Sequence, residues 1–453
     1  MCGIVGYSGP KEPLPILIGG LSRLEYRGYD SAGIAVSDGS DITIEKKEGK
    51  LDVLKEHLAD KKIKGNIGIG HTRWATHGVP NDVNAHPHSD NSEDFAIIHN
   101  GIIENYAEMK DSLLKENYSF KSDTDTEVVA IELSKQWNGN LLETVVKVTK
   151  DLEGTYALVV TTTKQENTIV AGRMMSPLVL GVGEGEVFLA SDSAAILEHT
   201  NKMIFLENGD FVEIHDGKYK LFDADLNDIE REVQIIDWEV SEAEKSGHDH
   251  FMYKEILEQA EVIERTITGR LEEGSPEIPI TKEEAQKYEK IWIVACGTAY
   301  HAGLFGKDLF EKVLGVPVSV ELASEFRYRE PIIGENDLGI VISQSGETMD
   351  TIAATELLKE NGSHVLALVN VVGSSLARMA DSVFYLHVGP EIGVASTKAY
   401  LGMLVGQLVL AKHWDTQNKL DVSFEEIKGL PSLIEETLKY EKEIKEIAES
   451  IYK

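Results

Sequence analysis

The chain has 453 residues, of which 42% are hydrophobic and 27% charged, and its formal net charge is −33. This length predicts two to three domains. The excess of acid argues against non-specific nucleic-acid binding, which needs clustered Lys and Arg. The two cysteines, Cys2 and Cys296, are too far apart for a compact disulfide or zinc motif. No charged segment precedes the apolar start, and we expect a cytoplasmic protein.

Residues 1–240 alternate short β-rich runs with turn signals. The runs are 3–7, 33–36, 67–70, 95–99, 157–161, 168–171, 187–190 and 203–206, and turns such as Asn208-Gly209 separate many of them. Two amphipathic patterns, 13–24 and 126–136, predict helices. Strands with helices packed outside them predict an α+β sandwich.

From residue 239 onward the pattern of predicted elements changes. Residues 239–249 lack a clear period and predict a linker, followed by a helix from 251 to about 270. Strands at 291–295, 339–343, 365–370 and 383–387 alternate with helical patterns, which predicts a doubly wound parallel sheet. The apolar stretch 392–411 contains Lys398 and predicts a buried helix, not a membrane span. A long charged helix closes the chain from residue 432. We therefore expect units at 1–240, 241–285 (linker and connecting helix), 286–430 and 431–453.

Cys2 follows Met1 directly, and a residue this small allows that methionine to be removed. Removal leaves a thiol and a free α-amine on one residue. The amine has an ordinary pKa of about 7.7–8.0, so it can serve as the base that activates the sulfur. The alternative for an isolated Cys2 is a small core residue at the start of a strand.

Other polar clusters in the first half fit hydrolysis of an amide by a thiol. Arg73 can hold a carboxylate through two hydrogen bonds, and Asp125 can receive an ammonium group. Asn100 with the Gly101 N–H can form an oxyanion hole. Taken singly, Arg73 also fits a surface charge, Asp125 a helix N-cap, and Asn100-Gly101 a type I′ turn. A substrate with carboxylate, ammonium and amide groups is glutamine.

The runs 24–33, 71–78, 84–88 and 99–105 resemble the class II, N-terminal-cysteine glutamine amidotransferases, and more narrowly the glutamine–fructose-6-phosphate aminotransferases. The resemblance implies a fold of the Ntn-hydrolase type. It implies Cys2 as nucleophile, Arg73 and Asp125 as glutamine anchors, and Asn100 with Gly101 as oxyanion donors. By the same resemblance Thr76 and His77 line the pocket and Trp74 gates the exit of ammonia. Histidines 71, 77, 86, 88 and 99 fit no metal-ligand spacing, so we expect structural roles and no metal.

A phosphate cradle is predicted in the second half. Strand residues 340–342 run into Ser343-Gln344-Ser345-Gly346-Glu347-Thr348 and then a helix. Hydroxyls and backbone N–H groups at a helix N-terminus bind an anion without cations. A second such turn spans 295–301, and both lie at carboxyl ends of strands. Cys296 has no base beside it in sequence and is expected to be a packed residue. For residues 343–348, the alternative is that a single serine caps the following helix and no anion binds.

These turns, with residues 321–328 and 391–399, resemble the first sugar-isomerase (SIS) domain of the same family. The resemblance implies that four side chains hold phosphate and three touch the sugar. The first set is Ser343, Gln344, Ser345 and Thr348, and the second is Thr298, Val394 and Ser396. Ala299 stands where some members have serine. The family's second sugar-isomerase domain and tail, with their catalytic glutamate, histidine and lysine, do not follow Lys453, and Lys398 matches the sugar loop and not the tail lysine.

The sequence thus predicts an enzyme of hexosamine biosynthesis that makes glucosamine 6-phosphate from glutamine and fructose 6-phosphate without a cofactor. For this chain we expect glutamine hydrolysis and phosphate binding but no synthesis of the aminosugar. We expect a homodimer in the full-length form, and no nucleic-acid or membrane partner. The alternatives are a non-catalytic sugar-phosphate sensor in which Cys2 is idle, and a related class II amidotransferase or deglycase.

Overall fold

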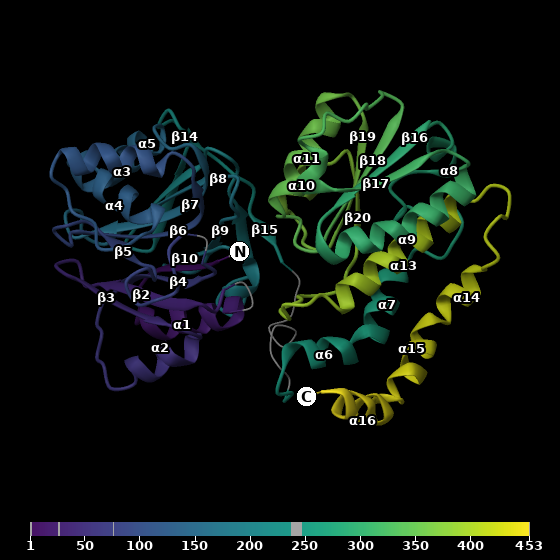
Figure 1. Ribbon diagram of the computed structural model, residues 1–453, viewed down its shortest axis with the longest axis horizontal. Helices are drawn as coiled ribbons and strands as arrows, with labels where there is room; N and C mark the ends of the chain where they lie inside the picture. The colour runs from purple at the N-terminus through teal and green to yellow at the C-terminus, as the bar shows by residue number, and fades with distance from the viewer. Residues whose placement is uncertain (1, 26–27, 76, 237–246, 453) are drawn as a thin grey trace. The chain divides into compact units, whose positions relative to one another are not determined.

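The computed structural model describes residues 2–25, 28–75, 77–236 and 247–452. It divides into two compact units, Met1–Val240 and Ser241–Lys453 (Figure 1). Within the described residues, no helix is long and apolar enough to cross a membrane.

The first unit is built on two antiparallel sheets. Among its described residues, eight strands follow the order β15-β11-β9-β10-β1-β4-β2-β3 and seven follow the order β14-β13-β12-β8-β7-β6-β5. The first sheet comprises β1 (Gly3–Ser8), β2 (Ser31–Ser37), β3 (Ile42–Glu48), β4 (Ile67–Arg73), β9 (Val179–Val182), β10 (Val187–Ala190), β11 (Lys202–Phe205) and β15 (Gln234–Ile235). The second comprises β5 (His88–Ser89), β6 (Phe95–Ile103), β7 (Gly154–Thr162), β8 (Thr168–Met174), β12 (Phe211–His215), β13 (Lys218–Phe222) and β14 (Asp228–Ile229).

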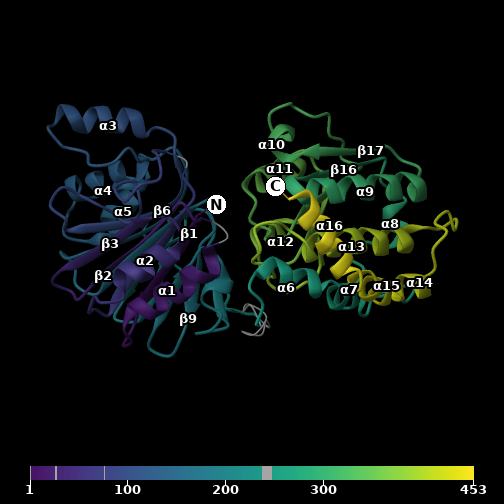
Figure 2. The ribbon, with the colours of Figure 1, turned by 60° about the horizontal axis from the view of Figure 1, so that its bottom comes forward.

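Alternating side chains explain how the two sheets stack. Ile4 and Ile98 belong to one buried cluster that takes residues from both sheets. Their strand neighbours Val5 and Ile97 point the opposite way and pack under helices. Helices α1 (Pro13–Leu24) and α2 (Leu51–Leu58) cover the first sheet (Figure 2), whereas α4 (Asp125–Lys135) and α5 (Leu141–Thr149) cover the second. Helix α3 (Tyr106–Lys115) packs on α4. The predicted α+β sandwich is confirmed.

The second unit is a parallel five-stranded sheet, counted within its described residues, in the order β17-β16-β18-β19-β20. Its strands are β16 (Lys290–Ala295), β17 (Val318–Leu322), β18 (Asp337–Ser343), β19 (His364–Val369) and β20 (Ser382–Tyr385). One face packs on α7 (Gln259–Ile267), α9 (Gly297–Leu314) and α13 (Lys398–Trp414), and the other on α10 (Ala323–Phe326), α11 (Met349–Glu360) and α12 (Ser375–Met379). The predicted doubly wound sheet is confirmed, and its strand order reverses between β16 and β18, where ligands of such sheets bind.

Several elements differ from the sequence prediction. The helix expected from 251 to 270 is two helices, α6 (Phe251–Leu257) and α7, which meet at Glu258. The expected terminal helix is likewise α15 (Leu430–Leu438) and α16 (Glu441–Ile451), preceded by α14 (Phe424–Lys428). The strands that were not predicted are β3, β5, β9, β12, β13, β14, β15 and β17. Of these, β3 and β17 carry charged or polar residues and are only partly buried, so they lack the apolar run used to find strands. The short helix α8 (Lys282–Ala285) starts with a capping box at Thr281.

Candidate functional site

The Cys2 thiol lies beside the end of strand β4. Strand β1 pairs with β4 so that Gly3 faces Thr72, which brings Cys2 next to the segment after Arg73. The Trp74 N–H donates a hydrogen bond to the Cys2 Sγ at 3.2 Å. Burial raises the pKa of the Cys2 thiol, whereas the Trp74 backbone and the Arg73 charge act in the opposite direction. A thiol with a raised pKa needs a base before it can attack a carbonyl.

Asn100 contacts the Cys2 backbone from the other sheet, and Gly101 follows it in the same strand. The Asn100 Nδ2 donates to the Cys2 carbonyl oxygen at 2.9 Å. The two residues do not form the type I′ turn considered above, because both lie inside strand β6. Gly101 has φ of +131°, and a Cβ at this position would come within 2.0 Å of the Thr155 carbonyl oxygen. Glycine is therefore required where β6 meets β7.

Arg73 is not a surface charge, since it is 3% exposed. Its Nη2 donates to the carbonyl oxygens of His77 and of Gly78, the latter at 3.3 Å. Its Nη1 is buried and has no hydrogen-bond partner among the described residues. Buried donors are almost always paired, so this nitrogen is suited to a bound acceptor.

Asp125 is the first residue of helix α4. The N-cap is Thr124, so the alternative that Asp125 serves as the N-cap is wrong. The Asp125 Oδ2 accepts a hydrogen bond from the Ile103 N–H at 2.9 Å, and the His99 Nδ1 lies 3.9 Å away. A carboxylate can accept about four hydrogen bonds, so further acceptor sites exist on Asp125.

The segment between Trp74 and Gly78 carries the remaining predicted pocket residues. Trp74 is 43% exposed and meets Tyr29 edge to face at 5.3 Å. His77 packs against Tyr106 in the same manner at 5.0 Å. Thr76 lies outside the described residues.

Sequence reasoning gave no role to two residues that hold this segment. The Asp30 Oδ2 accepts from the Ala75 N–H at 2.8 Å. The Asn84 side chain donates to the Val79 carbonyl at 3.0 Å and accepts from the Asp123 N–H at 2.9 Å. Both residues fall within the runs 24–33 and 84–88 that carried the resemblance, which is the signal that could have found them.

Three of the buried histidines pack against one another. His71 stacks on His86 with ring centroids 4.2 Å apart, and His86 meets His88 edge to face at 4.7 Å. Burial lowers the pKa of His71 to about 3 and holds the pKa values of His86, His88 and His99 below their usual value. In the part of the chain that the structure describes, no three His, Cys, Asp or Glu residues are placed to hold a metal ion.

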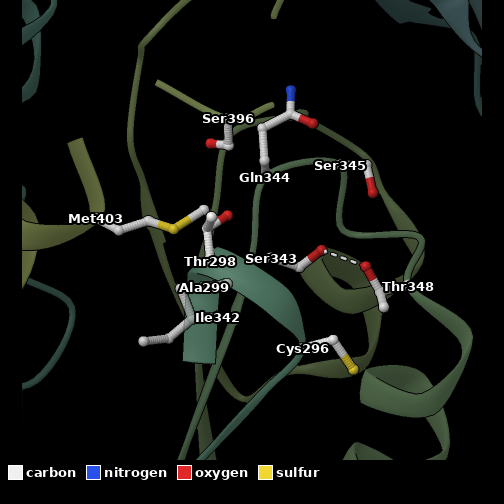
Figure 3. A pocket seen from close by; sticks show the side chains of 10 residues that line it. All are labelled: Cys296, Thr298, Ala299, Ile342, Ser343, Gln344, Ser345, Thr348, Ser396 and Met403. Atoms are coloured by element: carbon white, nitrogen blue, oxygen red, sulfur yellow. Dashed lines mark hydrogen bonds between the residues drawn. The ribbon is translucent and has the colours of Figure 1, made fainter. Parts of the chain in front are cut away.

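A second candidate site lies in the other unit, where strand order reverses. A cavity of about 170 Å³ is lined by Cys296, Thr298, Ala299, Ile342, Ser343, Gln344, Ser345, Thr348, Ser396 and Met403 (Figure 3). The Ser343 Oγ lies 3.0 Å from the Thr348 Oγ1 and accepts from the Gly346 N–H at 3.0 Å. Gly346 has φ of +66°, and a Cβ there would lie 2.1 Å from the Ser374 Oγ. Uncharged hydroxyl and amide side chains near the starts of helices α9 and α11 thus line much of the cavity.

Six of the seven residues predicted for sugar phosphate line this cavity, and Val394 does not. Val394 is 67% exposed in the loop before α13. Lys398 is buried, and its Nζ lies 2.6 Å from the Glu258 Oε2. Cys296 both packs on the core of one sheet face and lines the cavity, and burial raises the pKa of its thiol.

Comparisons with known proteins match a different domain family to each of the two units. A glutamine amidotransferase domain model matches residues 56–234, and a SIS domain model matches residues 285–411. The glutamine–fructose-6-phosphate aminotransferase [isomerizing] of Clostridium acetobutylicum is 47% identical over 463 aligned positions, covering 100% of this chain and 76% of that relative. The protein of the same name from Clostridium tetani is 48% identical, covering 99% of this chain and 75% of the relative. The solved C-terminal domain of glucosamine-fructose-6-phosphate aminotransferase from Francisella tularensis has a TM-score of 0.43 and 39% identity, covering 46% of this chain and 61% of that one.

Proposed function

This chain belongs to the family of isomerising glutamine–fructose-6-phosphate aminotransferases, and we propose that it releases ammonia from glutamine at Cys2 and binds fructose 6-phosphate between β16 and β18. The observation that carries the first half is the position of the Cys2 thiol. Its sulfur accepts a hydrogen bond from the Trp74 N–H, and the Cys2 carbonyl oxygen accepts one from the Asn100 carboxamide. The observation that carries the second half is the cavity lined by hydroxyl groups.

In the proposed glutaminase reaction, removal of Met1 frees the Cys2 α-amine, which takes the thiol proton. The sulfur attacks the glutamine side-chain carbonyl carbon, a C–S bond forms, and the carbonyl oxygen becomes an oxyanion. The Asn100 Nδ2 carries two hydrogens. One donates to the Cys2 carbonyl oxygen, and the other can donate to the oxyanion together with the Gly101 N–H. Collapse returns the proton to the departing nitrogen, releases ammonia and leaves a glutamyl thioester, which water hydrolyses to glutamate.

Arg73 and Asp125 are the proposed anchors of the α-carboxylate and α-ammonium groups. The Arg73 Nη1, buried without a partner among the described residues, would bond the carboxylate. Asp125 keeps acceptor capacity beyond its bond to the Ile103 N–H. His77 and Thr76 would line the pocket, and Trp74, whose ring is partly exposed, would gate the exit of ammonia.

For the sugar phosphate we propose that Ser343, Gln344, Ser345 and Thr348 hold the phosphate. Hydroxyls, backbone N–H groups and the positive ends of two helix dipoles bind such a dianion without Lys or Arg. Thr298, Ser396 and Val394 would contact the sugar, although Val394 does not line the cavity in this structure.

The decisive experiment measures glutamate, glucosamine 6-phosphate and sugar-phosphate binding separately. Cys2→Ala should abolish glutamate release because residues 1–240 contain no other cysteine, while fructose 6-phosphate binding stays at the wild-type value. Ser343→Ala should weaken fructose 6-phosphate binding and leave glutamine hydrolysis without sugar unchanged. Glutamate release that survives Cys2→Ala would refute the nucleophile. A wild-type chain that binds the sugar phosphate but leaves glutamine intact would instead favour the sensor.

We also propose a cytoplasmic location and a homodimer of the full-length form. The described cysteines, Cys2 and Cys296, are both free, which suits a reducing compartment. The proposed functional boundaries are 1–240 for the glutaminase, 241–285 for the connection, 286–430 for the sugar-isomerase unit and 431–453 for the terminal helices. Light scattering after gel filtration tests the dimer.

A further inference from the structure

His71 joins the two sheets of the first unit at the end where Cys2 lies. It belongs to β4 in one sheet and is fully buried. Its Nε2 lies 3.0 Å from the His99 carbonyl oxygen and 3.0 Å from the Asn100 Oδ1, both in β6 of the other sheet. Strand β4 also carries Arg73 and leads to Trp74, which contacts the thiol. A single imidazole therefore links the strand beside the nucleophile to the strand of the oxyanion donors.

The chemistry of these partners determines the tautomer of His71. Both are oxygen acceptors, so the Nε2 must carry the proton. The Nδ1 is buried and has no partner among the described residues. Burial lowers the pKa of His71 to about 3, which keeps the ring neutral near pH 7. Stacking on His86, with ring planes 14° apart, limits rotation of the ring.

The same partners determine which way the Asn100 carboxamide points. Its Oδ1 accepts from His71 and its Nδ2 donates to the Cys2 carbonyl. A flipped amide would place N–H against N–H at His71 and oxygen against oxygen at Cys2. Burial makes two such unpaired contacts costly, because neither group can turn to water instead.

We propose that His71 is a positioning residue of the oxyanion hole, whose Nε2–H holds the Asn100 carboxamide with its N–H groups directed toward the acyl centre. His71 touches neither glutamine nor the reacting atoms and acts through Asn100. The inference rests on the proposed function, in which Asn100 stabilises the oxyanion formed at Cys2.

The test compares His71→Met, which keeps the volume but removes the donor, with His71→Gln, whose amide nitrogen can reach the position of the Nε2. Loss of an oxyanion donor lowers kcat by about 10²–10³-fold, and a misoriented donor should cost roughly 10–100-fold. We therefore expect His71→Met to lower kcat for glutamate release by that factor, with KM for glutamine changed by less than about threefold. His71→Gln should recover most of the lost rate.

His88→Met is the matched control. His88 is also buried, and its Nε2 lies 3.0 Å from the Thr124 Oγ1, but no hydrogen bond connects it to Asn100 among the described residues. It should lower stability but not kcat. Equal losses of kcat in His71→Met and His88→Met would overturn the proposal in favour of a general packing role.

Two further measurements isolate the route through Asn100. In an Asn100→Ala background, His71→Met should cause no additional loss of kcat, whereas fully additive losses would contradict the proposal. Alkylation of Cys2 by iodoacetamide forms no oxyanion and should keep its wild-type rate in His71→Met. If His71→Met does not fold, a folded His71→Gln that loses as much activity as Asn100→Ala overturns the proposal. Failure of the proposed function is distinct, because it appears as an inactive wild type or an active Cys2→Ala.

Discussion

The Arg73 guanidinium is buried beside the Cys2 thiol, and burial lowers its pKa. Its hydrogen-bond acceptors among the described residues are the neutral carbonyl oxygens of His77 and Gly78. A buried cation with neutral partners gains most from a ligand that brings a negative charge. In the proposed glutamine pocket, Arg73 would therefore select for the α-carboxylate group.

Replacing Arg73 with lysine should be disruptive, although the charge is kept. Lysine offers a point charge without the planar fork that bonds a carboxylate and two backbone carbonyls at once. We expect KM for glutamine to rise by about tenfold or more, from the loss of one charged hydrogen bond. Steady-state kinetics measure this.

Arg231→Lys is the control for this substitution, because Arg231 pairs with Asp210 in the same unit at 2.8 and 2.9 Å. It should leave KM unchanged. An unchanged KM in Arg73→Lys would place the carboxylate anchor elsewhere.

The buried histidines predict acid sensitivity of the first unit. Their folded pKa values are lowered by burial, to about 3 for His71, whereas the unfolded chain titrates near its ordinary value of about 6.5. Below about pH 6.5 the unfolded state binds protons that the folded state does not. Each such histidine then lowers the free energy of unfolding by up to ~1.4 kcal/mol per pH unit until its folded pKa is reached.

Urea denaturation of the first unit between pH 7.5 and pH 4.5 measures this effect. His88→Gln, which removes one of these titrating groups, should flatten the dependence of stability on pH. An identical slope in wild type and variant would show that His88 is not protonated differently in the two states.

At the scale of elements, helix α6 fixes the loop that leads into α13. The buried Glu255 accepts hydrogen bonds from the backbone N–H groups of Ile392 at 2.6 Å and Gly393 at 3.0 Å. The Glu391 Oε1 accepts from Thr397 and Ala399 at 2.8 and 3.1 Å. Two carboxylates thus set the course of the loop that brings Ser396 to the cavity.

Glu255→Ala should therefore weaken sugar-phosphate binding without touching the ligand. Hydrogen bonds to a charged group contribute about 1.5–3 kcal/mol each, so we expect the Kd for fructose 6-phosphate to rise roughly tenfold or more. Isothermal titration measures the change. Glu261→Ala, which removes an exposed carboxylate of α7 paired with Arg265, is the control and should not alter Kd. Equal affinity in both variants would mean that the loop is held by other contacts.

At the scale of the whole molecule, the hydrophobic clusters of the first unit use residues from Ile4 to Ile236, and those of the second use residues from Val262 to Ile434. Each unit therefore has its own core, which is the physical requirement for independent folding.

Expression of residues 1–240 alone should give a folded protein that hydrolyses glutamine with kcat similar to that of the 453-residue chain without sugar phosphate. Circular dichroism and glutamate release test this. An insoluble or inactive 1–240 unit would refute the proposed boundary and show that the core or the site needs residues beyond it.

The sequence by itself determined the fold class of both units and the family, because periodic apolar runs and long polar motifs are local signals. It also predicted the order of strand, hydroxyl-rich turn and helix around residues 343–348, since these three elements are consecutive in the chain. Its errors were also local: a helix at 251–270 that is broken at Glu258, and partly buried polar strands such as β3 that have no apolar pattern.

Tertiary structure decided what depends on residues distant in sequence. Asn100-Gly101 has the composition of a turn but continues strand β6, because β7 pairs along its whole length. His71 bonds Asn100, 29 residues away, only because two sheets stack, and Glu255 bonds Ile392 across 137 residues. Such hydrogen bonds depend on packing between elements, which no local pattern encodes. The sequence motifs therefore identify the chemical groups, whereas the packing of sheets and helices determines how those groups are oriented.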